Sequence, residues 1–143
     1  MTEMSLRAAQ VSHLFPRHRR SPGQARQAFR GWAAGQGLGA AAVEAGELVV
    51  GELAANAVLA ATGPGRRIEV RFALGDGTLR VEVSDAGDGA PAVRAPGSLD
   101  EHGRGMVLVD ALAEDWGVRA RHGVGKTVWA VFEVVGPDPL TPC

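Results

Sequence analysis

The amino-acid sequence predicts an α+β domain in which a mixed, mostly antiparallel sheet carries helices on one face. Between residues 21 and 61, apolar side chains recur at helical spacing, and from residue 68 onward they alternate with polar ones. The predicted order is a first strand, two helices, a hairpin, a third helix and two final strands. This order is typical of an α+β layer, an antiparallel or mixed sheet with helices on one face.

Composition indicates a single folded domain. The chain has 143 residues, of which 45% are hydrophobic and 22% charged. A net charge of -1 and an aromatic content of 5% argue against direct nucleic-acid binding. The single cysteine, Cys143, excludes an internal disulfide framework. With no run of 18 apolar residues and no apolar signal stretch at the start, we expect a cytoplasmic protein with no membrane partner.

The first part of the chain predicts an N-terminal arm followed by a helix. Residues 1–20 form the arm, within which residues 5–11 suit an edge strand. Ser21 and Pro22 then read as a helix N-cap and a proline in the first turn, and the helix continues to about Ala34.

A second helix, from about Ala40 to Ala61, carries the most informative pattern. Its apolar stripe is defined by Val49, Leu53 and Ala57. Glu52 and Asn56, one turn apart, fall inside that stripe. Because burying an unpaired polar group costs roughly 2–7 kcal/mol, the two side chains either bond each other within the core or face a cavity that holds a ligand.

A hairpin follows the helices. Strands over residues 68–74 and 79–84 flank a turn at residues 75–77. Asp85 has the same parity as the buried side chains of the second strand, so we expect it to point inward. Residues 86–102 are rich in Gly, Pro and Asp, and a loop of this length is often a lid or a binding loop.

The rest of the chain predicts a short helix over residues 103–113 and strands over residues 116–120 and 127–134. We therefore place the folded domain at residues 21–135, with a flexible tail at residues 136–143.

Two glycine-rich segments suit a nucleotide. In Asp85-Ala86-Gly87-Asp88-Gly89, an inward carboxylate could accept a bond from an exocyclic amine while the glycines let a ligand approach the backbone; an ordinary turn is the alternative. Gly103-Arg104-Gly105 opens a helix whose exposed N–H groups can bind an anion, and a flexible helix start is the alternative.

Taken in order, these segments resemble the Bergerat-fold (GHKL) superfamily, and within it the anti-sigma-factor serine kinases, which are histidine-kinase-like ATPases. The matching segments are Glu47–Ala57 (the N box), Asp85–Gly89 and Gly103–Leu112 (the two glycine boxes), with Trp116-Gly117 and Gly125–Trp129 in the terminal strands. The resemblance covers residues 20–134 and implies a Bergerat-type two-layer α/β sandwich.

The resemblance also implies that ATP and Mg²⁺ bind between the helix layer and the loop. Asn56 would bind Mg²⁺ and Glu52 would be the catalytic base. The other implied ATP contacts are Asp85 at the adenine amino group with Gly87 and Gly89 around it, Thr127 near the adenine, and Gly103, Arg104 and Gly105 on the phosphate side.

The implied function is ATP-dependent phosphorylation of a serine on an anti-anti-sigma partner, together with sequestration of a sigma factor in transcription regulation. Members of this family are often homodimers. The sequence departs from the family at Leu59 and Ala60, where a basic or His residue is common. Two alternatives stay open: a non-catalytic switch that binds nucleotide or protein and acts by sequestration only, and a scaffold whose polar residues are satisfied within the core.

Overall fold

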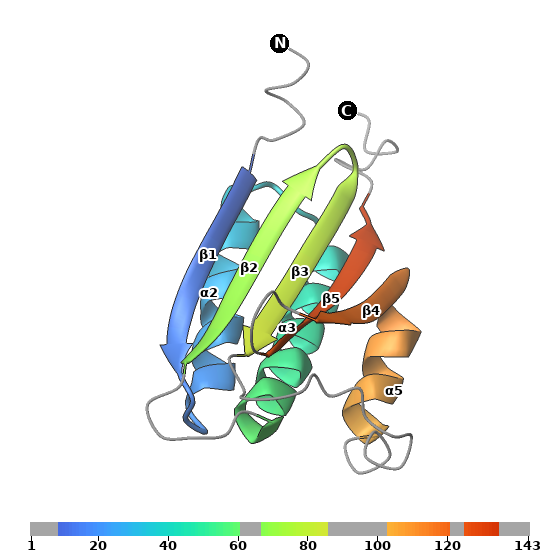
Figure 1. The fold of residues 1–143 in the computed structure, drawn as a ribbon. Helices are drawn as coiled ribbons and strands as arrows, with labels where there is room; N and C mark the ends of the chain where they lie inside the picture. Colours follow the sequence, from blue (N-terminus) through green and yellow to red (C-terminus); the bar gives the residue numbers. More distant parts are fainter. Residues whose placement is uncertain (1–8, 61–66, 86–102, 121–124, 135–143) are drawn as a thin grey trace, which may run out of the picture.

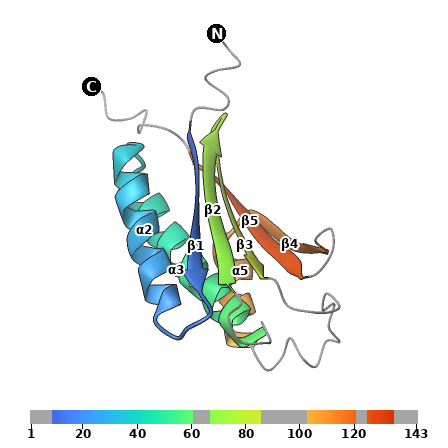
Figure 2. The same cartoon turned by 60° about the vertical axis from the view of Figure 1, so that its left-hand side comes forward.

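The computed structural model describes residues 9–60, 67–85, 103–120 and 125–134. They form a five-stranded sheet in the order β1-β2-β3-β5-β4, with every neighbouring pair antiparallel. Helices α2, α3 and α5 form a second layer against this sheet (Figures 1 and 2). The predicted α+β fold and its two-layer sandwich are confirmed.

Strand β1 (Ala9–Pro16) is the edge strand beside β2, and it lies later in the chain than the predicted residues 5–11. Residues 5–8 are outside the described residues. The register pairs Val11 with Phe72 and Phe15 with Ile68, so the alternating side chains of β1 lie over the aromatic part of the core.

Helix α2 (Ser21–Gly35) matches the prediction in extent, but the predicted cap is wrong. Arg20 occupies the N-cap position and makes no side-chain capping bond. Ser21 is fully buried, and its hydroxyl donates instead to the carbonyl oxygen of Pro16 at 2.6 Å. Ser21 therefore ties the start of α2 to the end of β1, while Pro22 stands in the first turn as expected.

Helix α3 (Ala40–Ala60) has the predicted extent, but its buried face is rotated from the predicted one. Val49 and Leu53 are buried as expected, whereas Leu48 is 44% exposed and Leu59 is 65% exposed. Gly51, two residues after Val49 and therefore on the opposite side of the helix, is also buried. The rotation arises because α3 packs against both the sheet and α2, and a single helical pattern does not reveal two partners.

Strands β2 (Arg67–Gly75) and β3 (Thr78–Asp85) form the predicted hairpin. The turn residues Asp76 and Gly77 have φ angles of 59° and 74°. Two positive φ angles in a two-residue loop are typical of a type I′ turn, which matches the twist of the strands.

The remaining described elements are α5 (Gly103–Leu112), β4 (Asp115–Ala120) and β5 (Lys126–Glu133). Strand β5 lies in the sheet between β3 and β4, and α5 packs against α3 and β4. Each boundary is within about one residue of the prediction. Within the described part of the chain, no helix is long and apolar enough to cross a membrane.

Candidate functional site

The residues singled out by sequence gather at one end of the sheet. The C-terminal half of α3 lies there, together with the end of β3, the first turn of α5 and the start of β5 (Figure 1). These segments bring Glu52, Asn56, Asp85 and Thr127 to the same end of the molecule as Gly103-Arg104-Gly105. Gly87 and Gly89 lie outside the described residues, so their predicted positions are not tested.

Asp85 is the most deeply buried acidic side chain of this end. It is 4% exposed and continues the face of β3 that buries Val81 and Val83. This confirms the inward orientation expected from strand parity. A carboxylate removed from water needs a charged or strongly donating partner, because an uncompensated buried charge is costly.

Lys126 provides such a partner. It stands directly opposite Asp85 in the β3–β5 register, and its Nζ lies 3.0 Å from Asp85 Oδ2. The side chain of Lys126 is 18% exposed, so the pair is largely shielded from water. Sequence reasoning missed this residue, since β3 and β5 are neighbours in space but separated in the chain by α5 and β4, and their register has no local signal.

One residue further along β5, Thr127 pairs with Ser84. The two hydroxyl oxygens lie 2.7 Å apart, and both residues are buried. Because adjacent residues of a strand point to opposite faces, this pair and the Asp85–Lys126 pair face opposite sides of the sheet. The predicted place of Thr127 near an adenine stays a prediction.

Glu52 and Asn56 lie on the flank of α3 that faces α5, and both are half-buried. The Asn56 amide nitrogen lies 3.5 Å from Met106 Sδ on α5. Among the described residues no bond joins Glu52 to Asn56, so the alternative of an internal pair within the core does not hold. Their position at the margin of the core leaves both polar groups partly accessible.

The first turn of α5 begins at Gly103, as the sequence predicted. It contains no acidic residue. The first N–H groups of a helix have no partner within the helix and carry partial positive charge, which suits an anion such as phosphate. Glycine at this position allows a ligand to come close to the backbone.

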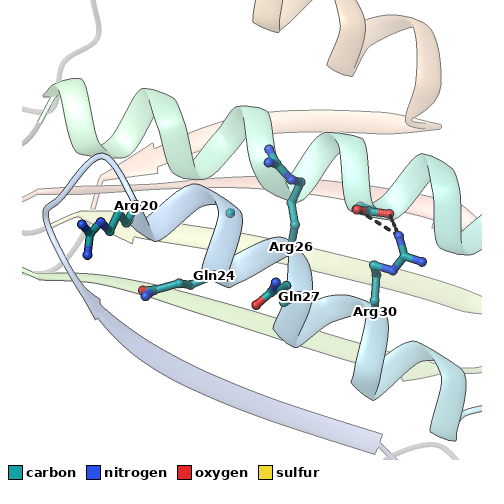
Figure 3. Close-up of a pocket in the computed structure, with 7 residues that line it drawn as sticks. Arg20, Gln24, Arg26, Gln27 and Arg30 are labelled. Carbon is teal, nitrogen blue, oxygen red and sulfur yellow. Dashed lines mark hydrogen bonds and ion pairs between the residues drawn. The ribbon is translucent and has the colours of Figure 1, made fainter.

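A separate groove of about 530 Å³ runs along α2, away from these residues (Figure 3). Two of its arginines are engaged in joining α2 to α3. On α2, Arg30 Nη1 lies 3.2 Å from Glu47 Oε1 of α3. The Arg26 side chain crosses α3 at Gly51, where a Cβ added to the glycine would lie 2.8 Å from Arg26 Nη1. The groove contains none of the predicted site residues, and Arg26 and Arg30 serve the contact between the two helices.

Comparisons with known proteins give a family match and a similar solved structure. The family model of the histidine kinase-like ATPase domain matches residues 15–132. Among solved structures, the chain is similar to the crystal structure of the RsbU and RsbW domains of Rv1364c from Mycobacterium tuberculosis, with a TM-score of 0.69 and 20% sequence identity. That match covers 90% of this chain and 33% of the other, so this chain spans about a third of its length. At this identity the similarity shows the fold. A search of the curated proteins finds no match.

Proposed function

Because the chain belongs to the histidine kinase-like ATPase domain family, we propose that it is an ATP-binding regulator of the anti-sigma-factor type. In this proposal it transfers the γ-phosphoryl group of ATP to a serine of an anti-anti-sigma partner and sequesters a sigma factor. A cytoplasmic location and a role in transcription regulation belong to the same proposal, as does the homodimer that is frequent in such regulators.

One observation carries the proposal: the buried carboxylate of Asp85 lies at the same end of the sheet as the glycine-led start of α5. An ionised carboxylate accepts hydrogen bonds only, and the exocyclic amine of adenine donates them. A helix N-terminus takes phosphate through its unpaired N–H groups. An adenine nucleotide presents an amine at one end and phosphates at the other, so a single ligand suits both groups.

The residues present also suit a magnesium ion carried by the nucleotide. Mg²⁺ prefers oxygen ligands and is often held by one or two protein groups together with substrate phosphates. The amide nitrogen of Asn56 is directed to Met106, and its side-chain oxygen is the group that would bind the ion. When bound, Mg²⁺ supplies charge neutralisation of the transferring phosphoryl group.

Glu52 is the proposed general base. It lies one helical turn before Asn56 and is half-buried, so a hydroxyl from a partner protein can reach it. As the serine oxygen bonds to the γ-phosphorus, the bond from that phosphorus to the oxygen bridging to the β-phosphate breaks and ADP leaves. Glu52 accepts the serine proton. General-base assistance of this kind contributes about 10²–10⁴ in rate.

The second candidate is a switch without catalysis, and Leu59 favours it. This side chain is 65% exposed, at a place where a basic or His residue is common in similar regulators. An exposed leucine gives no charge to a phosphate. In this alternative ATP binds and controls sequestration, and no serine is modified.

Phosphoryl transfer tests the proposal directly. Partners are first captured from the native host with the full chain in the presence and absence of ATP, and each purified partner is then incubated with the chain and γ-labelled ATP. We expect label on a serine with the wild type, loss of label with Glu52→Gln, and retained label with Glu47→Gln, an acidic control on the same helix. ATP binding with no transfer to any partner would support the switch, and transfer by Glu52→Gln would remove Glu52 as the base.

A further inference from the structure

Lys126 is the only lysine of the chain, and it lies against the carboxylate that the proposed function assigns to adenine. Its ammonium group carries three N–H donors. Within the described part of the chain, its one hydrogen bond goes to Asp85 Oδ2 at 3.0 Å. Two further donors therefore stand beside the carboxylate, on a side chain that is only 18% exposed.

We propose that Lys126 reads the adenine ring together with Asp85 by donating a hydrogen bond to the ring nitrogen N1. This inference rests on the proposed function, because it requires adenine to bind at Asp85. In adenine the exocyclic amine and N1 are neighbours on one edge of the ring, so the base presents a donor beside an acceptor. Asp85 and Lys126 present the complementary acceptor beside a donor.

The two contacts are compatible on one carboxylate. An ionised carboxyl group has two oxygens and about four lone-pair positions, so it can accept from Lys126 and from an amine together. The sheet register fixes the two side chains next to each other, since Asp85 and Lys126 are direct partners on adjacent strands. The register therefore places the lysine beside any base that the carboxylate holds.

The same pair would reject guanine held in the same orientation. Guanine carries a carbonyl oxygen where adenine has its amine, and an N–H where adenine has the N1 acceptor. The oxygen would face the carboxylate and the N–H would face the ammonium group, so both contacts become repulsive. Discrimination by a repulsive contact as well as a favourable one is a general route to specificity.

A purely structural ion pair is the competing explanation. In that case Lys126 only neutralises Asp85, and its removal lowers stability without changing which atoms of the base are recognised. The two explanations differ in one measurable quantity, the affinity for an adenine nucleotide that lacks N1.

The experiment measures binding of ATP, 1-deaza-ATP and 3-deaza-ATP, each with Mg²⁺, by calorimetry on wild type and Lys126→Met. 1-deaza-ATP has a C–H in place of N1, and 3-deaza-ATP is the matched control because the nitrogen it lacks lies on another edge of the ring. In the wild type we expect 1-deaza-ATP to bind about tenfold more weakly than ATP, as for loss of a hydrogen bond to a charged group. In Lys126→Met that ratio should fall to about one, while the ratio for 3-deaza-ATP stays the same in both proteins.

Equal affinity of the wild type for ATP and 1-deaza-ATP would overturn the inference and leave the proposed function standing. An affinity ratio of ATP to 1-deaza-ATP that is unchanged in Lys126→Met would also overturn the inference and leave the proposed function standing. Absence of ATP binding by the wild type would remove the proposed function and this inference with it. If Lys126→Met does not fold, Lys126→Ala takes its place in the same comparison of the three nucleotides, since it also lacks a donor.

Discussion

Two regions of the layer between the sheet and the helices are filled by different kinds of side chain. Under β1 and β2, the layer between the sheet and the helices is aromatic. The rings of Phe29 and Phe72 meet edge-on with their centroids 5.1 Å apart, and the ring centroids of Trp32 and Phe72 lie 5.5 Å apart. At the end where β3 finishes and β5 begins, the same layer contains Asp85 and Lys126. The aromatic region around Phe72 is filled by apolar side chains, whereas the polar end places charges where apolar side chains could have packed.

This difference is the one expected if the aromatic region serves the fold and the polar end is the proposed nucleotide site. Aromatic packing gives stability through buried apolar area and favourable ring geometry. A buried ion pair gives little net stability, because desolvation of both charges offsets their attraction. The polar end is therefore explained better by recognition than by folding, and stability and binding should respond to mutations in different regions.

Phe29→Ala should give the largest loss of stability. The side chain is fully buried, and truncation leaves a cavity beside Phe72 and Trp32. We expect the free energy of unfolding to fall by about 3–5 kcal/mol, measured by urea denaturation. Leu14→Ala is the control, since Leu14 is 60% exposed and its loss should cost less than about 0.5 kcal/mol. Similar losses for both variants would contradict the assignment of the aromatic region as the stabilising one.

Asp85→Ala should cost less, about 1–3 kcal/mol, because Lys126 retains some contact with water. The double variant Asp85→Ala/Lys126→Ala should be less destabilised than the sum of the single variants. Urea denaturation of the three proteins gives this coupling energy. Strict additivity would show that the two charges do not interact, against the 3.0 Å contact.

Two glycines of α3 give a matched pair within the helix layer. A Cβ at Gly46 would overlap the ring of Phe29, whereas one at Gly51 would meet only the movable side chain of Arg26. We expect Gly46→Ala to destabilise by about 1–2 kcal/mol, since overpacking outweighs the gain in helix propensity. Gly51→Ala should be neutral or stabilising. Thermal melts compare the two variants, and the reverse order of stability would show that the aromatic region accommodates extra volume.

The smallest effect is expected at the surface of the helix layer. Arg30 and Glu47 form an ion pair in which the arginine side chain is 62% exposed. Glu47→Gln should change the free energy of unfolding by less than about 0.5 kcal/mol, because exposed pairs are screened by water and salt. A loss above 1 kcal/mol would mean that this pair, rather than aromatic packing, holds α2 to α3.

Much of this arrangement was predictable from local pattern. Strand parity placed Asp85 inward, and alternation placed the hairpin about Asp76 and Gly77. The failures share one cause. Lys126 pairs with Asp85 through the register of two strands that are distant in the chain. The buried face of α3 is rotated because α2 covers a second side of this helix. The Ser21 hydroxyl donates a hydrogen bond to Pro16, on the other side of the turn between β1 and α2. Each depends on tertiary contacts that no segment encodes alone.

Calorimetric titration with ATP and Mg²⁺ tests the central claim, that the polar end of the sheet is a nucleotide site, most directly. We expect the wild type to bind ATP and Asp85→Asn to bind it about tenfold or more weakly, with a smaller change in affinity for GTP. Near-ultraviolet circular dichroism checks that the variant is folded. Equal affinities of wild type and Asp85→Asn for ATP, or a wild type that binds no ATP at millimolar concentration, would contradict it.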